Sequence, residues 1–447
     1  MRMDNFDEKR CVVNAEDLTD GTDFIGEFSD ELNKYQGRIA GSEQETACAR
    51  AIRNRLHDET DAKTRLEAFR AYPLAGRGSF LCLGIWFSLC YVVYFISFAG
   101  SRLAGALVTA LALALFVAGT TVLILIYLGD LRLAKILPRK VSYNVVSEFS
   151  KSEEVEHIYI VADNHDAKLG SCIKDFNVMR KVAVIVPPIS AFVFVLFCIL
   201  KMALGTSTGN VAAKISLLTI IPVVTGIFGI VAFVLHYSPR AKDARQTSGT
   251  ATCIAMATYA YFVEKPELLA DKAKVVYVSL GAENCAHCGS EAFVKAHPEY
   301  AGAKVLCIED VRNGEIKIVD TDVVRKLQYS PEVVGALQAS AAEQGIDVSV
   351  LLHDTLKHKF NSLHGFASNA FAKNGSATAT LTSRDYSLKE KPLSKEQTEQ
   401  LFSLCVGAFE KLMQRDEQIQ SKPDTPEEVV EQVAPSAEME IVDVESK

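Results

Sequence analysis

Residues 275–299 read VVYVSLGAENCAHCGSEAFVKAHPE, and the order of apolar and polar residues in this stretch decides the fold class. The first seven residues form a mostly apolar run, rich in valine, of the length that a buried central strand needs. A short helix is predicted at 290–296, and a second apolar strand follows at 303–308 (AKVLCI). A strand, a helix and a strand in this order predict an alternating α/β domain.

The same alternation continues on both sides of this stretch. A third buried strand is predicted at 157–162 (HIYIVA), and strand-like alternation occurs at 64–69 and 142–149. Further helices are predicted at 45–56, 248–263, 331–343 and 395–413. Residues 415–447 are rich in acidic residues, contain proline and lack aromatic side chains, so we expect this tail to be disordered.

Four long stretches without charged residues interrupt the α/β pattern, at 78–101, 103–129, 182–200 and 215–234. A helix needs about 20 apolar residues to cross a bilayer, and the rest of the chain is too short to bury four such runs. We therefore expect four transmembrane helices in two hairpins, with Pro187 and Pro188 bending the third helix. Because the interiors of the spans carry no Asp, Glu, Lys or Arg, they are expected to act as anchors rather than as a transport path.

Lysine and arginine indicate the orientation of these hairpins. They gather on the outer flanks, whereas the two loops within the hairpins hold only Arg102, Lys201 and Lys214. Cytoplasmic flanks carry the excess of both residues, so we expect a multi-pass protein of the cell membrane with both termini and the α/β domain in the cytoplasm. The expected divisions are 1–77, 130–181 and 237–414 for the α/β domain, 78–129 and 182–236 for the hairpins, and 415–447 for the tail.

Composition excludes some functions and favours one compartment. The net charge is −8, and no basic patch suggests binding to nucleic acid. The 11 cysteines lack the spacing of a disulfide framework, which favours a reducing compartment. Cys285 and Cys288 have the spacing of a zinc or redox motif, but no second pair follows, so incidental buried thiols are expected. The polar and charged start of the chain predicts no cleavable signal peptide.

Polar and acidic residues follow each of the three buried strands. They are Asp163, Asn164 and His165 after the first strand, Glu283 and Asn284 after the second, and Glu309 and Asp310 after the third. Ligands bind at the carboxyl ends of strands in open α/β sheets, so these residues could form a metal or acid–base site. Acids in such positions also cap the helices that follow. The spacing leaves both interpretations open.

Several segments resemble the di-zinc aminopeptidases of the bacterial leucyl aminopeptidase and glutamate carboxypeptidase type, the twenty-eighth metallopeptidase family. The matching segments are 38–42 (RIAGS), 143–146 (YNVV), 158–162 (IYIVA), 248–249 with the helix after it, 275–299 and 370–375 (AFAKNG). The resemblance covers most of the chain outside the spans. It implies an aminopeptidase-like mixed sheet flanked by helices, here interrupted by two transmembrane hairpins. It also implies two zinc ions that activate a water, with a glutamate as general base.

The residues at the family's zinc-ligand positions depart from its pattern. The His-x-Asp motif is reversed as Asp163-Asn164-His165, and the glutamate pair has become Glu283-Asn284, with Glu283 retained as the candidate general base. The next acid survives as Glu309, or as Asp310 with a shift of one residue. No histidine occurs at 383–386, where the late ligand belongs.

The bridging aspartate of the family corresponds to Arg245. An arginine cannot lose its proton, so it places a cation where two dications would lie. At most two of five ligand positions keep a ligating side chain, whereas a catalytic zinc typically has three protein ligands. We therefore expect no cofactor, with Arg245 forming a buried ion-pair network with Asp163, Glu283 and Glu309.

The expected function is that of a catalytically impaired, peptidase-like pseudoenzyme. It would act as a binding or regulatory scaffold at the membrane surface, with the lipid bilayer and a peptide or protein ligand as its partners. The alternative is an atypical membrane-bound metallopeptidase that holds one zinc through Asp163, His165 and Glu309 and uses Glu283 as general base.

Overall fold

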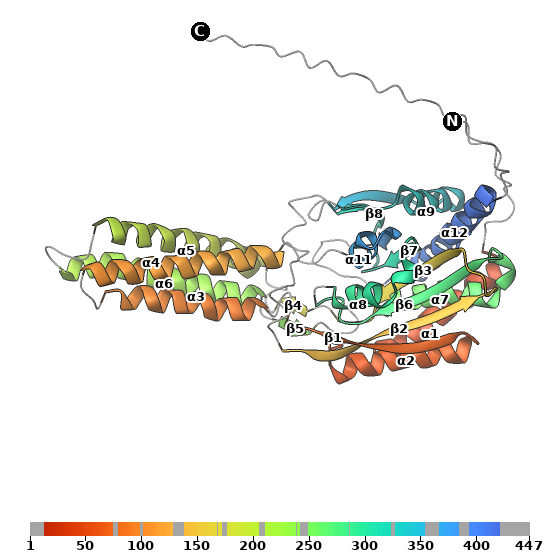
Figure 1. Ribbon diagram of the computed structural model, residues 1–447, viewed down its shortest axis with the longest axis horizontal. Helices are drawn as coiled ribbons and strands as arrows, with labels where there is room; N and C mark the ends of the chain where they lie inside the picture. The colour runs from red at the N-terminus through yellow and green to blue at the C-terminus, as the bar shows by residue number, and fades with distance from the viewer. Residues whose placement is uncertain are drawn as a thin grey trace, which may run out of the picture.

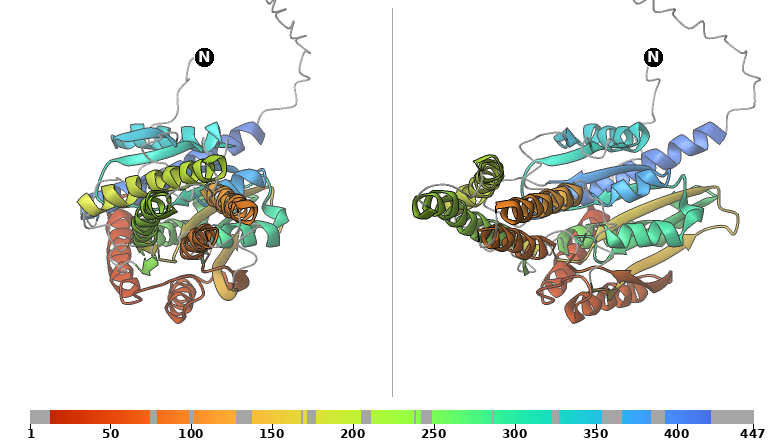
Figure 2. Two further views of the ribbon diagram at one scale, coloured as in Figure 1. Left: turned by 90° about the vertical axis from the view of Figure 1, so that its left-hand side faces the viewer. Right: turned by 60° about the vertical axis from the view of Figure 1, so that its left-hand side comes forward.

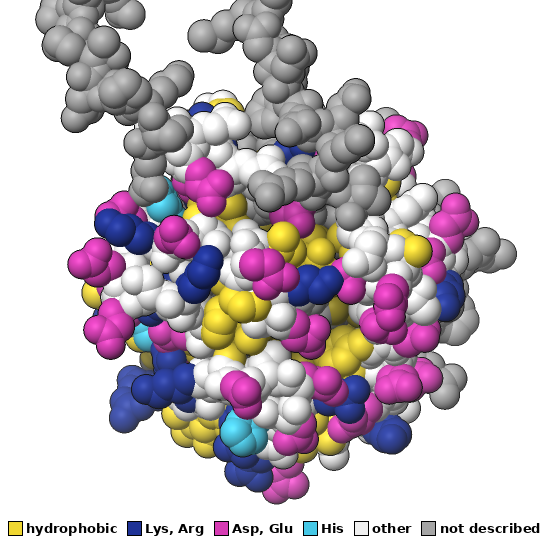
Figure 3. Space-filling view, turned by 90° about the vertical axis from the view of Figure 1, so that its right-hand side faces the viewer, with side chains coloured by type: hydrophobic (Ala, Val, Ile, Leu, Met, Phe, Trp, Pro, Cys, Tyr) yellow, Lys and Arg dark blue, Asp and Glu magenta, His cyan; other side chains and the backbone are white. Residues whose placement is uncertain are grey.

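The computed structural model describes residues 13–74, 79–98, 102–127, 138–167, 169–171, 177–204, 211–237, 239–241, 249–285, 287–322, 327–353, 366–383 and 393–420. An α/β domain forms one part, and a bundle of four apolar helices extends from one end of it (Figure 1). The end of the α/β domain away from the bundle carries lysine, arginine, aspartate and glutamate side chains intermixed over its surface (Figure 3). Such mixed charge is expected of a surface in water.

A mixed sheet forms the centre of the α/β domain. Its strands lie in the order β1 (Lys63–Ala71), β2 (Lys140–Ser150), β6 (Ala273–Leu280), β3 (His157–Asn164), β7 (Lys304–Ile308), β11 (Ala377–Thr382), β8 (Ile316–Asp322) and β10 (Val348–His353), and β9 (Leu327–Gln328) pairs with β8. The central strands β6, β3, β7 and β11 run parallel to their neighbours in this group. β1 and β2 form an antiparallel ribbon at one edge. The three buried strands predicted from apolar runs are β3, β6 and β7.

Helices cover both faces of the sheet, and each face has its own apolar core. One face is covered by α1 (Ala15–Leu32), α2 (Glu43–Glu59), α7 (Gly249–Glu264), α9 (Pro331–Gln344) and α12 (Lys395–Gln420). The other is covered by α8 (Cys288–Ala296) and α11 (Ser368–Lys373), and the short helices η4 (Pro266–Leu268) and η5 (Pro298–Tyr300) lie in loops. α1 was not predicted. α12 continues to Gln420, beyond the helix end predicted at residue 413, and residues 421–447 lie outside the described part.

The bundle consists of α3 (Ser79–Ile96), α4 (Arg102–Tyr127), α5 (Asn177–Leu204) and α6 (Val211–Tyr237), gathered side by side (Figure 2). Large apolar side chains point outward from all four helices, including Ile85, Leu107, Phe192 and Phe228, each more than half exposed. Among the described residues, two stretches, Leu103–Leu125 and Ile185–Ala203, are long and apolar enough to cross a membrane. The apolar stretches in α3 and α6, Leu81–Ile96 and Ile220–Val234, are shorter. Membrane crossing and its orientation remain predictions.

One cation lies inside the bundle, contrary to expectation. Lys201 was assigned to a loop, but it belongs to α5 and its side chain is only 2% exposed. Its Nζ donates a hydrogen bond to Ser97 Oγ and lies 3.3 Å from the centre of the Phe98 ring. A lysine can extend its aliphatic stem through apolar surroundings when its charged end finds such partners.

A second, two-stranded sheet connects hairpin two to the α/β domain. It pairs β4 (Leu169–Ser171) with β5 (Pro239–Ala241) in antiparallel fashion, and β4 contacts α6. β4 follows closely after Asp163–Asp166 in the chain, and the two strands hold the ends of hairpin two together. The loop that ends β3 is therefore placed beside the base of the bundle.

Candidate functional site

The polar residues at the carboxyl ends of β3 and β6 form one buried cluster. Asp163 and Ser279 lie opposite each other in the parallel pairing of these strands. Asp163 Oδ1 accepts hydrogen bonds from Ser279 Oγ at 2.8 Å and from Thr252 Oγ1, on α7, at 2.7 Å. Burial raises the pKa of Asp163 to about 6, although these hydrogen bonds act to lower it. Two hydroxyl groups thus occupy one oxygen of a residue that was predicted as a metal ligand.

His165 is attached to the same serine. Its Nδ1 lies 3.0 Å from Ser279 Oγ. Because Ser279 donates its only proton to Asp163, we assign the Nδ1 proton of His165 as the donor to Ser279. Burial, together with the Arg38 guanidinium, lowers the pKa of His165 to about 3, so the imidazole is neutral. Its other nitrogen, Nε2, is buried and accepts no hydrogen bond from the described residues.

The guanidinium described at this site belongs to Arg38, which was not predicted as a site residue. Arg38 is buried in the loop between α1 and α2, and its Nη1 donates to the carbonyl oxygen of Leu32 at 2.8 Å. Its own carbonyl oxygen accepts from the backbone N–H of Ala167 at 2.6 Å, which joins this loop to the end of β3. Arg245, predicted to supply the cation, lies outside the described residues. In the sequence, the segment 38–42 that contains Arg38 drew attention only because it resembles the aminopeptidase family, and no role was predicted for Arg38.

Glu45, a second residue missed, joins three parts of the domain. Its carboxylate accepts hydrogen bonds from Ser142 Oγ and the backbone N–H of Ala282, both at 2.8 Å, and from the backbone N–H of Gly41. Burial raises the pKa of Glu45 to about 7. The sequence carried a signal, because Ser42-x-x-Glu45 has the spacing of a helix capping box, and Ser42 Oγ does accept from Glu45 N at 3.1 Å.

Glu283, the candidate general base, caps the start of α8. One oxygen, Oε2, accepts from the backbone N–H of Ser290 at 3.0 Å. The other, Oε1, accepts from Ser290 Oγ at 2.9 Å and is in contact with His287 Nδ1. Both carboxylate oxygens are therefore engaged within the protein. Of the two interpretations that the sequence left open for Glu283, these contacts favour the helix cap.

Asn284, at the former ligand position, binds Asp166. Its backbone N–H donates to Asp166 Oδ2 and its side-chain amide to Asp166 Oδ1, both at 2.8 Å. Asp166 was not predicted as a site residue. Its pKa lies well above the ordinary value because it is buried and because Glu45 and Glu283 are near. The adjacent residue, Asn164, is buried at the end of β3.

The acids after β7 belong to a different part of the sheet edge. Glu309 Oε1 accepts from the backbone N–H of Ala367 at 2.6 Å. Asp310 has a positive φ of 53° and its Oδ1 lies 3.7 Å from Arg312 Nη2. Within the described ranges, no three His, Cys, Asp or Glu side chains are grouped so that they could hold a metal ion. Asp163, His165 and Glu309, the predicted zinc ligands, thus do not form such a group there.

Cys285 and Cys288 are buried next to this cluster. Cys288 Sγ donates to the carbonyl oxygen of Cys285 at 3.0 Å. Burial raises the pKa of Cys288 to about 12, which favours the thiol form. That both thiols are incidental stays a prediction. His353, His358 and His364 occur in a polar stretch of the sequence and are expected to be surface histidines. Their side chains lie outside the described part.

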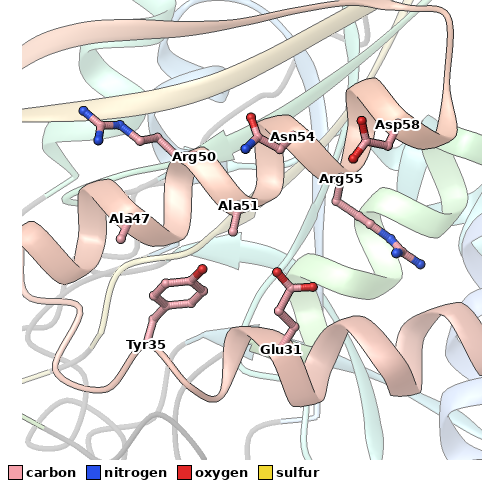
Figure 4. A pocket seen from close by; sticks show the side chains of 8 residues that line it. All are labelled: Glu31, Tyr35, Ala47, Arg50, Ala51, Asn54, Arg55 and Asp58. Carbon is pink, nitrogen blue, oxygen red and sulfur yellow. The ribbon is translucent and has the colours of Figure 1, made fainter.

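A polar pocket of about 340 Å³ opens between α1 and α2, on the outer side of the domain. Tyr35 and Glu31 point toward α2, where Ala47 and Ala51 face them (Figure 4). The remaining lining residues are Arg50, Asn54, Arg55 and Asp58. Two cations and two anions line the pocket, so its charge does not favour an ionic ligand of either sign. It was not predicted from the sequence.

No protein-family model matches the chain, and no curated protein matches it. Solved structures with some similarity include a Zn-dependent exopeptidase from Parabacteroides distasonis, with 8% identity, a TM-score of 0.47, and 88% of this chain and 97% of that chain covered. A glutaminyl cyclase from Fimbriiglobus ruber has 10% identity and a TM-score of 0.46, covering 87% and 95%. A zinc aminopeptidase from Bacillus subtilis has 12% identity and a TM-score of 0.44, covering 88% and 94%. At these scores the similarity assigns neither a family nor an activity.

Proposed function

We propose that this protein is anchored in a membrane by α3–α6 and presents a peptidase-like α/β domain that binds a peptide or protein partner at the cytoplasmic surface without hydrolysing it. The observation that carries the proposal is the internal engagement of Glu283 and Asn284, which occupy the positions of base and metal ligand in the resemblance. Glu283 caps α8, and Asn284 binds Asp166.

The exposed side chains of the bundle support membrane anchoring. Leu103, Phe192 and Phe228 are exposed by 72%, 68% and 65%. Soluble proteins rarely expose a continuous apolar surface of this kind, because its contact with water is unfavourable. Helices satisfy their backbone hydrogen bonds internally, so a bundle of this kind suits a bilayer. The excess of lysine and arginine on the outer flanks supports a cytoplasmic α/β domain.

The hydrogen bonds of the cluster support the absence of hydrolysis. A general base must reach the proton of an attacking water through an available oxygen. Both oxygens of Glu283 instead contact residues at the start of α8. An amide at residue 284 is a poor zinc ligand, and it is also needed as a donor to Asp166.

A hydrolysis assay on the full-length, detergent-purified protein tests this proposal. The probe is a panel of aminoacyl-4-nitroanilides, assayed with added zinc, for the wild type and for Glu283→Gln. We expect no release of nitroaniline above the buffer rate from either protein. Turnover by the wild type that is lost in Glu283→Gln would overturn the proposal. Extraction of native membranes with alkaline carbonate separately tests anchoring, because an integral protein stays in the pellet.

One observation favours the alternative, a metallopeptidase with a single zinc. The Nε2 atom of His165 is buried and accepts no hydrogen bond from the described residues, whereas buried polar atoms normally have a partner. A neutral imidazole is also the form that binds zinc. Against this, Glu309 is turned to the backbone of Ala367, and the described part holds no group of three ligands. The residues described do not fit a zinc site.

A further inference from the structure

Three cationic side chains gather at the end of the β1–β2 ribbon that lies nearest the bundle. In the antiparallel register, Arg70 is opposite Val141, and Ala71 is opposite Lys140. Arg70 and Lys140 therefore lie at diagonal positions of the ladder, with their side chains on opposite faces of the ribbon end, and Arg139 directly precedes Lys140. All three side chains are exposed. We call Arg70, Arg139 and Lys140 the ribbon-end cluster.

Two contacts hold the cluster in place. The Arg139 guanidinium carbon lies 6.0 Å from the centre of the Tyr72 ring, within the range of a cation–π interaction. Gly41 lies directly against Lys140, because a Cβ on Gly41 would be 2.4 Å from Lys140 Cβ. The stem of Lys140 is thus packed against the loop 38–42, and its charged end remains at the surface.

The positive charge of the cluster has no counterion among the described residues, since none of its three side chains forms an ion pair there. The other end of the same sheet edge differs. Arg65 binds Glu67 at 2.7 Å and also pairs with Glu148, and Lys274 binds Glu148 at 2.9 Å. Among the described residues, the cations are paired with acids at the end far from the bundle and form no ion pair at the end near it.

The cluster lies where the chain enters and leaves hairpin one. β1 ends at Ala71 and α3 begins at Ser79, while α4 ends at Tyr127 and β2 begins at Lys140. The end of the ribbon consequently lies beside the base of the bundle (Figure 1). If the bundle occupies a bilayer, the cluster is at the level of the cytoplasmic headgroups, where anionic lipids attract basic residues.

From this unpaired charge and its place, we propose that the ribbon-end cluster binds the headgroups of anionic phospholipids and so holds the α/β domain in one orientation on the membrane. The proposal rests on the proposed anchoring of the bundle. The occupant is a lipid of the surrounding bilayer, because the cluster is an exposed surface next to the bundle and its charge is complementary to that of the headgroups. Each cation is expected to contribute roughly fivefold to the preference for anionic lipid.

The single tryptophan provides the measurement. Trp86 lies in α3, so energy transfer from it to dansyl-labelled lipids reports which lipids gather around hairpin one. The full-length protein is reconstituted in phosphatidylcholine nanodiscs that contain a trace of dansyl-phosphatidylserine or dansyl-phosphatidylcholine. We expect stronger transfer to the phosphatidylserine probe. The triple variant Arg70→Gln, Arg139→Gln, Lys140→Gln should transfer equally to both probes.

A charge-matched control separates the cluster from net charge. The variant Lys34→Gln, Arg50→Gln, Arg53→Gln removes three exposed cations, one in the turn after α1 and two in α2, and should keep the preference of the wild type. An unchanged preference in the ribbon-end variant, or equal transfer in the wild type, would overturn the proposal. Carbonate extraction of the same proteins distinguishes this failure from a failure of anchoring. Protein released by carbonate contradicts the membrane proposal itself, whereas protein retained without lipid preference contradicts the headgroup proposal only.

Discussion

Asn284 donates two hydrogen bonds of 2.8 Å to the carboxyl group of Asp166, one from its backbone and one from its side chain. The resemblance places a zinc-ligating acid at residue 284, and a carboxylate there would face the buried carboxyl group of Asp166. The amide removes this repulsion and satisfies Asp166 instead. The two hydrogen bonds from Asn284 explain how the chain tolerates the buried acid Asp166.

The first prediction concerns this pair. Asn284→Asp removes the side-chain donor and places two acids together, which should lower the free energy of unfolding by about 2–4 kcal/mol. Thermal unfolding of the full-length protein, followed by circular dichroism, measures the loss. Asn54→Asp, a like change at an exposed position of α2, is the control and should have little effect. A variant Asn284→Asp that unfolds at the wild-type temperature would contradict the structural role of the amide.

A second prediction concerns pH. Burial raises the pKa of Glu45 from its ordinary value of 4.5 to about 7, so the folded protein binds a proton that the unfolded chain releases between these values. This contribution to stability is complete below about pH 4.5 and is lost as the pH rises through 7, a change of about 3 kcal/mol. The unfolding temperature should therefore fall between about pH 5 and pH 8. Glu45→Gln should be less stable but show a flatter dependence on pH.

The neighbouring residue Glu43 supplies the control for this titration. It is exposed at the start of α2, and Glu43→Gln should keep the pH dependence of the wild type. If Glu45→Gln and Glu43→Gln show the same slope as the wild type, the burial of Glu45 is not the source of the effect.

The packing of the bundle gives a third prediction. A Cβ on Gly226 of α6 would lie 2.4 Å from the Tyr91 ring of α3, which itself packs on Phe194 at 4.6 Å between ring centres. Gly226→Ala should thus separate the two hairpins and lower the unfolding temperature in detergent by several degrees. Gly26 of α1 has nothing within 4 Å of its Cβ position, so Gly26→Ala should be neutral or stabilising by up to about 1 kcal/mol. Equal effects of the two changes would contradict the described packing.

Apolar runs were sufficient to predict the centre of the fold. β3, β6 and β7 are buried on both faces, so their sequences are nearly continuous in valine, isoleucine and other apolar residues. α1 was missed although Ile25, Phe28 and Leu32 lie on one face, because the helix also contains many acids and two glycines. One glycine, Gly21, allows close approach to Phe402, and such a contact between distant segments has no local signal.

The cluster at the sheet edge could be predicted only in part. Asp163, His165 and Glu283 were recognised because they follow strands directly. Glu45 binds Ala282, which is 237 residues away in the chain, so its role depends on the completed fold. Lys201 was placed in a loop because a charge was taken as the end of the span. Its partners Ser97 and Phe98, directly after α3, become visible only when the helices are packed together.

The zinc content of the full-length protein tests the central claim most directly. The purified protein is incubated with excess zinc, freed of unbound metal by gel filtration and analysed by mass spectrometry. Since Glu283, Asn284 and Glu309 contact other parts of the protein, we predict far less than one zinc per chain, with the same value in Asp163→Asn and Glu309→Gln. One zinc per chain in the wild type, lost in both variants, would contradict the account and make hydrolysis the leading interpretation.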